Sequence, residues 1–453
     1  MTATPSADAL TGKDFYLFEF ERAEAGLAWK GQDWLCPLRK EAISRFAQMG
    51  FPTRRNEQWR HTNLAQLERT PFKFAPPVSL NSEAAARVRA LLFDSAEAIQ
   101  MVFVNGYFAP DLSSPCRASD GLTVSTLAQA VQAQPELARH LLARHARYED
   151  HPFVALNTAF MRDGAFIFVA DGRKLESPIH LLFVSTAPGE AVVSHPRNLF
   201  IVGDSAQAQI VETYAGLADE AYFTNATTEV VLSRNSRVDH YKVQRESPMA
   251  FHLGAVQAFQ AQGSRYVSLA ISFGAALARN DIASTLGAEG CECILNGLYL
   301  GADSQHLDTH TRLDHSAPNC RSRQLYKGIL GGQASAVFNG RIHVRPNAQK
   351  TDAIQSNQCL LLSEAATINS QPQLEIFADD VKCTHGAAVG QLDEDGVFYL
   401  RSRGLAEPQA RGLLTFAFAN EIVEWIKVAP LRKSLESLIA ERYGSGQVPE
   451  GAS

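Results

Sequence analysis

Several signatures of nucleotide-using and hydrolytic enzymes are missing from this 453-residue sequence. No G-x-x-x-x-G-K-[ST] loop occurs, because Gly12-Lys13 has neither the earlier Gly nor a following Ser or Thr. No G-x-G-x-x-G follows an expected strand, and no G-x-S-x-G elbow is present. Dinucleotide binding and serine-hydrolase chemistry therefore have no support, and any ATP hydrolysis would have to come from a partner.

Long apolar runs, an excess of positive charge and paired cysteine motifs are also missing. No run approaches the roughly 18 apolar residues of a membrane span, and the first 15 residues do not resemble a secretory signal. A formal net charge of -6 argues against general nucleic-acid binding. Seven scattered cysteines do not suggest a disulfide framework. We therefore expect a cytoplasmic protein that binds neither nucleic acid nor membrane.

The first third of the chain is expected to be mostly helical. Residues 1 to about 20 are rich in Thr, Ala, Ser and Asp and are expected to form a loose end. Apolar residues then recur at helical spacing in three stretches. These are Trp34–Phe46 with Gly50 as the stop, Ala84–Leu92, and Leu127–Arg144 with a break at Pro135; a short strand is expected at 101–108.

From Pro152 to about residue 400 the pattern changes to many short strands separated by Gly, Asp, Asn and Ser. Almost no long helix is indicated in this region. Such a pattern is typical of a sandwich, a barrel or a β-solenoid. No exact internal repeat is present, so the residues alone leave these three architectures open.

Helical spacing returns after Gly404. Pro408 suits a first helical turn, and a second apolar face follows Pro430. The apolar residues that define the first face are Leu414, Phe418, Ile422 and Trp425. Such helices can simply cap the end of a β-domain. The last ten residues are expected to be disordered.

The stretch from Pro372 to Gly404 has the highest density of signals. Cys383 and His385 are two apart, so in an extended segment their side chains point from the same face. Asp393 to Gly396 indicates a turn, and Val397 to Leu400 an apolar strand. Thiolate and imidazole are both good ligands for iron, zinc or copper. One Cys and one His make only half a site, and a buried Cys beside a hydrogen-bonded His is the commoner arrangement.

Two other groups of residues have candidate metal ligands. His306, Asp308, His310, Arg312 and Asp314 share one face of an expected strand. They could bind a metal, or Asp308 could orient a histidine, but a hydrogen-bonded polar ladder on the outside of the β-domain is the favoured interpretation. Cys291 and Cys293 also share a face, and we expect them to be small buried residues.

The motif KCTHGAAVGQLDEDGVFYLRSRGL resembles the C-terminal signature of the SufB/SufD family of iron-sulfur cluster assembly proteins. The resemblance continues in HLDTHTRLDH, NCRSRQLYKGIL, AVFNGRIHV and KTDA, and in NEQWRHTNL near the N-terminus. These blocks occur in order from about residue 56 to about residue 426, which is far more specific than one motif.

This resemblance implies a mainly β fold with helical ends. The expected core is a right-handed parallel β-helix over residues 153–400, after a mostly helical N-terminal domain over residues 1–152. Residues 401–453 would form a C-terminal helical domain with a disordered tail. An ATPase would dock on this domain, with Leu414, Phe418, Ile422 and Trp425 as the partner-binding residues.

The resemblance also implies a non-catalytic scaffold subunit that works with a SufB-like subunit and a SufC-like ABC ATPase. Family members of the SufB type read more like EHEA where this chain has Thr384 to Ala387, and they place a Cys where it has Leu400. The chain therefore resembles the SufD branch. His385 would then share a transient iron-sulfur cluster with a SufB cysteine, with no cofactor permanently bound, and the isolated chain could form a homodimer. The role of Cys383 stays open between a ligand and a buried structural thiol.

Two alternatives come from other classes of protein. One is a cytoplasmic β-helix enzyme acting on polysaccharide, with Asp393 and Asp395 as acid and base. The other is a stand-alone zinc protein that uses His306, His310 and Cys383. Metal analysis of the purified chain would distinguish the second.

Overall fold

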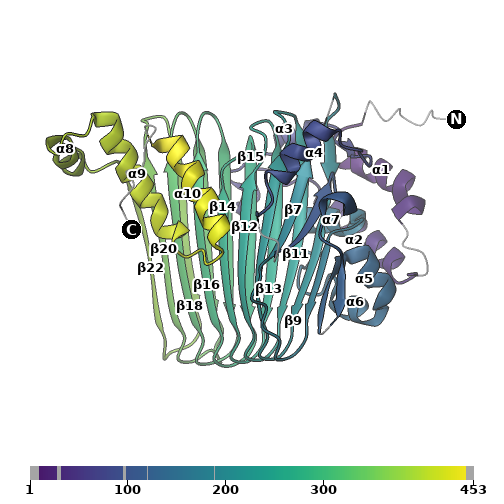
Figure 1. The fold of residues 1–453 in the computed structure, drawn as a ribbon. Coiled ribbons are helices and arrows are strands. Elements are labelled where there is room, and N and C mark those ends of the chain that lie inside the picture. The colour runs from purple at the N-terminus through teal and green to yellow at the C-terminus, as the bar shows by residue number, and fades with distance from the viewer. Residues whose placement is uncertain (1–9, 28–31, 95–97, 120, 188, 445–453) are drawn as a thin grey trace.

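Two long, mostly parallel sheets dominate a computed structural model of the chain, which describes residues 10–27, 32–94, 98–119, 121–187 and 189–444 (Figure 1). From β9 onward, odd-numbered strands lie in one sheet, which we call the odd sheet, and even-numbered strands lie in the other, which we call the even sheet. Of the earlier strands, β6 belongs to the odd sheet and β7 to the even sheet. The chain therefore crosses from sheet to sheet with every strand, and each strand pairs in parallel with the strand two places later. Of the three architectures that the residues left open, the parallel β-solenoid is confirmed.

The strands of the solenoid are long and regular. The odd sheet contains β6 Ala165–Val169, β9 Arg197–Val202, β11 Tyr222–Leu232, β13 Phe251–Gln260, β15 Leu277–Leu286, β17 His306–His315, β19 Ser335–Val344 and β21 Thr367–Ile376. The even sheet contains β7 Ile179–Ser185, β10 Gln207–Gly216, β12 Arg237–Arg245, β14 Arg265–Ser272, β16 Glu292–Gly301, β18 Arg321–Leu330, β20 Asp352–Leu361 and β22 Lys382–Gly390.

The start of the solenoid is closed by short antiparallel and parallel strands. These are β1 Lys73–Phe74, β2 Ile99–Val104, β3 Tyr107–Phe108, β4 Arg117–Ser119, β5 Leu122–Thr126 and β8 Val192–Ser194. β2 pairs antiparallel with β3, and β5 pairs antiparallel with both β4 and β6. The expected short strand at 101–108 is thus present as β2 and β3.

Helices of the N-terminal part pack at this closed end. They are α1 Gly12–Leu27, α2 Leu35–Met49, α3 Ala65–Arg69, α4 Ser82–Arg89, α5 Leu127–Ala133, α6 Pro135–Leu141 and α7 Pro152–Phe160, with short 3-10 turns at Glu57–Trp59 and Pro110–Leu112. α2 ends at Gly50, which has a φ of 63° as helix-ending glycines often do. Pro135 separates α5 from α6, as the sequence predicts.

Two secondary-structure predictions are wrong. Residues 12–20 are not a loose end but part of α1, whose Phe15, Tyr16 and Phe20 are buried; residues 1–9 lie outside the described residues. The expected turn and strand over Asp393–Leu400 is the helix α8 Glu394–Ser402. Asp393 caps that helix by accepting a hydrogen bond from the Asp395 N–H at 3.1 Å.

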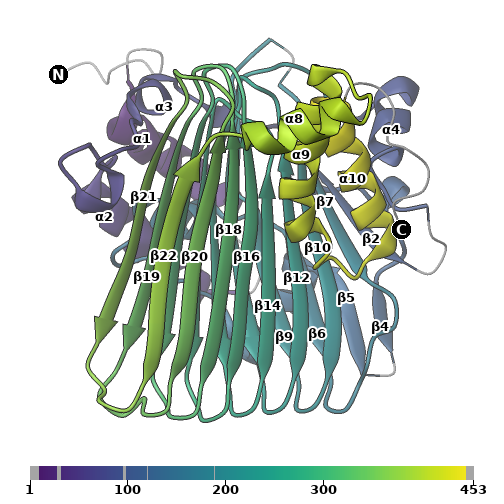
Figure 2. The same ribbon diagram turned by 90° about the vertical axis from the view of Figure 1, so that its left-hand side faces the viewer.

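The C-terminal helices pack on the even sheet. α9 Glu407–Val423 contacts β16 and β18, and α10 Ala429–Tyr443 packs beside α9. Figure 2 shows these helices over the upper part of the even-numbered strands, and Figure 1 shows α8 beyond the last strand, β22. Pro408 stands in the first turn of α9, as expected. The tail from residue 445 lies outside the described residues.

Candidate functional site

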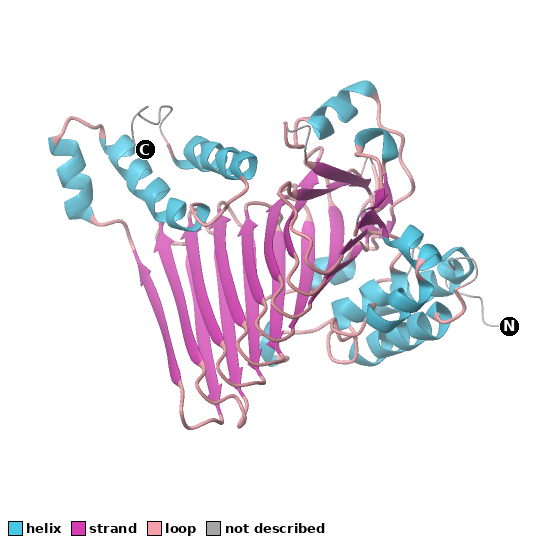
Figure 3. Cartoon of the chain, turned by 60° about the horizontal axis from the view of Figure 1, so that its bottom comes forward, coloured by secondary structure: helices cyan, strands magenta, loops and turns pink. Residues whose placement is uncertain are grey.

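The solenoid ends in two strands that have no neighbour on one side. β21 and β22 are the last strands of their sheets, and among the described residues no strand pairs with their outer edges. The view from below shows the same row of strands ending at β22 (Figure 3). Large apolar side chains are exposed at this end, with Val389 50% and Phe377 59% accessible. We call β21 and β22 with their unpaired edges the open end.

His385 and Cys383 both lie on β22, on the same face, as their spacing predicts. β22 pairs with β20 so that Cys383 stands next to Ala353 and His385 next to Gln355. Ala353 and Gln355 are buried inside the solenoid, so this face of β22 continues the inner face of the sheet. Cys383 is half-buried against the solenoid core, and His385 is exposed. Within the described residues, His385 makes no hydrogen bond or ion pair.

The two potential ligands differ chemically. Burial raises the pKa of the Cys383 thiol above its usual value, which keeps it protonated and weakens it as a metal ligand. The imidazole of His385 is exposed, and a histidine ring nitrogen is a common metal ligand. Within the described ranges, no group of three or more His, Cys, Asp or Glu could hold a metal ion. Cys383 and His385 are thus at most part of a ligand set.

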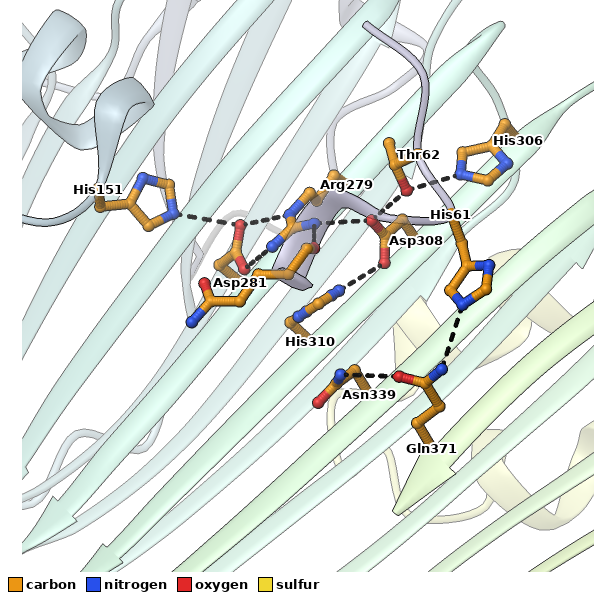
Figure 4. A network of polar contacts seen from close by, with 11 residues as sticks. His61, Thr62, His151, Arg279, Asp281, His306, Asp308, His310, Asn339 and Gln371 are labelled. Atoms are coloured by element: carbon orange, nitrogen blue, oxygen red, sulfur yellow. Dashed lines mark hydrogen bonds and ion pairs between the residues drawn. The ribbon is translucent and has the colours of Figure 1, made fainter. Parts of the chain in front are cut away.

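A second polar region lies on the outer face of the odd sheet. It is a groove of about 420 Å³ between the N-terminal part and strands β13 to β21. Asp281 lines this groove and accepts hydrogen bonds from two nitrogens of the buried Arg279, both at 2.9 Å; Arg279 also donates to Asp308 at 2.9 Å (Figure 4). His151 lies 3.2 Å from Asp281, and His310 lies 3.0 Å from Asp308.

The N-terminal segment covers part of this network. Thr62 donates to Asp308 at 2.6 Å, and the Trp59 ring lies 3.7 Å from the Arg279 guanidinium. Gln58 offers its carbonyl oxygen to Arg279 at 2.7 Å. The segment with the motif NEQWRHTNL is therefore hydrogen-bonded to β17, which has the motif HLDTHTRLDH. Polar residues of both motifs form these contacts.

The predicted external polar ladder on β17 is only partly correct. Arg312 is exposed, but Asp308 is 1% accessible because the N-terminal segment lies over it. Burial acts to raise the pKa of the Asp308 carboxyl, yet Arg279 and His310 outweigh it and hold that pKa well below its usual range. Asp308 is thus a buried anion paired with the Arg279 guanidinium.

The zinc hypothesis is not supported by the positions of its residues. His306 is bonded to Thr62 at 2.9 Å and to Ser335 at 2.8 Å, and His310 pairs with Asp308. Both stand on the outer face of the odd sheet, whereas Cys383 belongs to the even sheet and its inner face. The structure does not bring the three side chains together. Cys291 and Cys293 are buried in the solenoid core, as expected.

The four apolar residues predicted to bind a partner do not share one exposed face. Ile422 is fully buried against the solenoid, and Phe418 is partly buried with the Lys327 ammonium 4.1 Å from its ring. Leu414 is partly buried, and only Trp425 is clearly exposed, at 43%.

Sequence reasoning missed three exposed apolar side chains in this region. Phe398 is 73% accessible, Tyr399 56% and Leu413 37%. The first two were expected on a strand, and a correct reading of Asp393 as a helix cap would have revealed them.

No helix among the described residues is long and apolar enough to cross a membrane.

The fold defines a parallel β-solenoid protein with helical ends, and Cys383 and His385 lie on the last strand of its even sheet. Comparison with models of known protein families identifies the family. Residues 183–418 match the SufBD core domain of the SUF system for FeS cluster assembly, and residues 11–181 match the SufBD N-terminal region. The chain belongs to the SufB/SufD family of iron-sulfur cluster assembly proteins.

Individual relatives agree with this assignment. The chain is 34% identical to an iron-sulfur cluster assembly SufBD family protein of Synechocystis sp., over 98% of this chain and all of the relative. It is 31% identical to the iron-sulfur cluster assembly protein SufD of Escherichia coli, over 90% of this chain and 93% of the relative. SufD of Bacillus subtilis is 24% identical over 90% of this chain and 94% of its own length.

Proposed function

We propose that this chain is a non-catalytic scaffold subunit that helps to assemble nascent iron-sulfur clusters. It pairs with a SufB-like subunit at the open end, and a SufC-like ABC ATPase docks on its C-terminal helices. The cluster is the cargo of the complex rather than a resident cofactor of this chain. Without a SufB-like subunit, the same strands can pair with a second copy of the chain.

The observation that carries this proposal is the position of His385. It stands exposed on β22, whose outer edge has unpaired N–H and C=O groups. Such an edge accepts a strand from another chain, and main-chain hydrogen bonds then provide affinity. A partner bound there would bring its own ligands next to His385 and so complete a coordination set.

His385 is the preferred ligand of the two candidates. The raised pKa of the Cys383 thiol and its contact with the solenoid core favour a structural role for Cys383. An imidazole binds iron as a neutral group and can be released again when the cluster moves to an acceptor. One exposed histidine is therefore suited to holding a cluster transiently.

Docking of the ATPase is supported by the exposed apolar side chains of the C-terminal region. Four large apolar side chains stay exposed to solvent here, as is typical of a surface that binds another protein. They are Phe398 and Tyr399 on α8, Leu413 on α9 and Trp425 just after α9. Because Ile422 is buried against the solenoid, we assign the docking surface to these four exposed side chains. We call them the helical docking surface.

Anaerobic affinity purification of the tagged chain at native expression tests the partners. We expect an ABC-type ATPase and a SufB-like protein to copurify. A solitary chain that carries zinc or degrades a polysaccharide would contradict the scaffold role.

Substitution of His385 tests the ligand role. His385→Ala should leave folding and complex assembly intact, because the side chain is exposed and packs against little, but lower cluster formation on the complex about tenfold or more. Iron and sulfide content of the anaerobically reconstituted complex is the measurement. Thr384→Ala, on the opposite face of the same strand, is the matched control and should form clusters normally. Loss of partner binding or unfolding of His385→Ala would show that the ligand role is wrong.

A further inference from the structure

Three buried polar side chains lie inside the solenoid just below its last turn. Thr311 Oγ1 donates to Gln324 Oε1 at 2.7 Å, and Gln355 Nε2 donates to the same oxygen at 3.3 Å. All three residues are at most 2% accessible. The Gln355 amide packs against the backbone of Gly340, where any side chain would collide with it.

This cluster leaves one acceptor and one donor without a partner. Gln355 Oε1 and Gln324 Nε2 are buried, and neither makes a hydrogen bond within the described residues. Buried amide oxygens in folded proteins are nearly always paired, so an exception needs an explanation. The next polar group in the interior is satisfied, because Tyr299 donates to Asn357 at 2.9 Å and Asn357 donates to Ser370 at 2.9 Å.

The strand register makes His385 the neighbour of Gln355 on the next strand. Gln355 and His385 are direct partners in the β20–β22 ladder, and both side chains are on the inner face. Neighbouring strands in a sheet are about 4.8 Å apart, so an imidazole N–H on β22 is within reach of an amide oxygen on β20. Because Gln355 Nε2 already donates to Gln324, its oxygen is the amide atom left for His385.

We propose that Gln355 is a positioning residue for His385. Its Oε1 accepts the hydrogen bond of one ring N–H, which fixes the tautomer of the imidazole and leaves the lone pair of the other nitrogen for a metal at the open end. A ligand histidine commonly donates its second N–H to such a partner, which sets ring orientation and ligand basicity. This inference rests on the proposed ligand role of His385, but the two residues that it joins are strand partners within the chain alone.

The test is the tautomer of His385 in the full-length chain labelled with ¹⁵N at histidine. The His385→Gln spectrum identifies its signals among the 13 histidines. At pH 8.5, where an imidazole is ordinarily neutral, one ring nitrogen of the wild-type His385 should show the shift of a protonated nitrogen and the other that of an unprotonated one. In Gln355→Met, which keeps length and flexibility but removes the acceptor, both shifts should move toward each other as the tautomers interconvert.

Gln358→Met is the matched control, since Gln358 lies on the outer face of the same strand. It should leave the His385 signals unchanged. Equal His385 spectra in wild type and Gln355→Met, or an equal change in Gln358→Met, would overturn the inference.

Two features make the test decisive. If Gln355→Met does not fold, the wild-type chain alone answers the question, because a hydrogen-bonded ring N–H is protected from exchange and gives a direct ¹H–¹⁵N signal, whereas a solvent-exposed one does not. Absence of that signal for His385 would overturn the inference. The readout needs neither iron nor a partner, so failure of the tautomer test is distinct from failure of the cluster-forming test on His385→Ala.

Discussion

At the scale of single residues, burial decides what each histidine of this chain can do. His385 is exposed at the open end and makes no hydrogen bond within the described residues. His180, His195 and His315 are buried in the protein, and burial lowers the pKa of the first two to about 3 and of the third to about 4. These three imidazoles are neutral in the folded chain and have structural roles.

The buried histidines predict how stability depends on pH. In the unfolded chain each imidazole takes up a proton below about pH 6.5, whereas the folded state excludes it. The unfolded state then binds more protons, so the free energy of unfolding falls as the pH falls from about 6.5 toward 4. Each buried histidine should cost about 2 kcal/mol of stability between pH 7 and pH 5. Denaturant titrations at the two pH values measure the loss.

A single substitution isolates one share of this loss. His315 Nε2 lies 2.9 Å from Ser322 Oγ, and a Gln in its place can keep a hydrogen bond without taking up a proton. His315→Gln should therefore reduce the loss between pH 7 and pH 5, whereas His140→Gln on the exposed surface of α6 should not. An unchanged loss in His315→Gln would contradict a neutral buried His315.

Local spacing predicted the faces of side chains well but not what covers them. The shared face of Cys383 and His385 follows from strand alternation alone, as does the burial of Cys291 and Cys293. The burial of Asp308 does not, because it depends on Thr62, a residue 246 positions away. No pattern within one strand contains that contact.

At the scale of elements, α8 shows why a helix can be mistaken for a strand. Val397, Phe398 and Tyr399 are β-branched or aromatic, and they favour a strand by propensity. The helix nevertheless forms because Asp393 caps it and acidic residues stand in its first turn, where the helix dipole favours them. The capping signal was present in the sequence but was read as a turn.

The helical docking surface predicts different outcomes for two apolar residues of α9. Leu413→Asp places a charge where 37% of the residue is already accessible, so the fold should persist while binding of the ATPase weakens about tenfold or more. Ile422→Asp buries an unpaired charge against the solenoid and should cost several kcal/mol of stability. Thermal melting and a binding titration with the purified ATPase measure the two effects.

Met249→Asp is the control for this pair, since Met249 is an exposed apolar residue between β12 and β13 and is not part of the C-terminal helices. It should change neither melting nor ATPase binding. If Leu413→Asp destabilised the chain as much as Ile422→Asp, or bound the ATPase normally, Leu413 would not belong to the docking surface.

At the scale of the whole molecule, the residues alone could not identify the fold as a solenoid. Successive strands of the even sheet begin at Arg237, Arg265, Glu292, Arg321 and Asp352, so the structural repeat varies between 27 and 31 residues. Its turns share shape rather than sequence, and the residues at equivalent positions differ in type. Short strands with Gly and Asp turns were evident, but only the resemblance to a family could choose among three β architectures.

The two ends of the solenoid differ in a way that matters for assembly. At the start, antiparallel strands and the N-terminal helices close both sheets. At the other end, no strand among the described residues pairs with the outer edges of β21 and β22, and α9 lies on the face of the even sheet rather than along its last edge (Figure 2). A long exposed edge is a hazard for aggregation unless another chain covers it. The asymmetry therefore fits a protein that works as part of a complex.

A proline on β22 tests whether a partner strand pairs with this edge. The Lys382 N–H donates to Thr351 on the β20 side, so by alternation the N–H groups of Ala388 and its even-numbered neighbours point to β20, and that of Ala387 points outward. Ala387→Pro should then keep the fold but remove an outward donor, and weaken binding of the SufB-like subunit about tenfold or more. Ala388→Pro should instead break the ladder with β20 and lower the melting temperature. Normal partner binding by a folded Ala387→Pro chain would mean that the subunits meet through side chains or another surface.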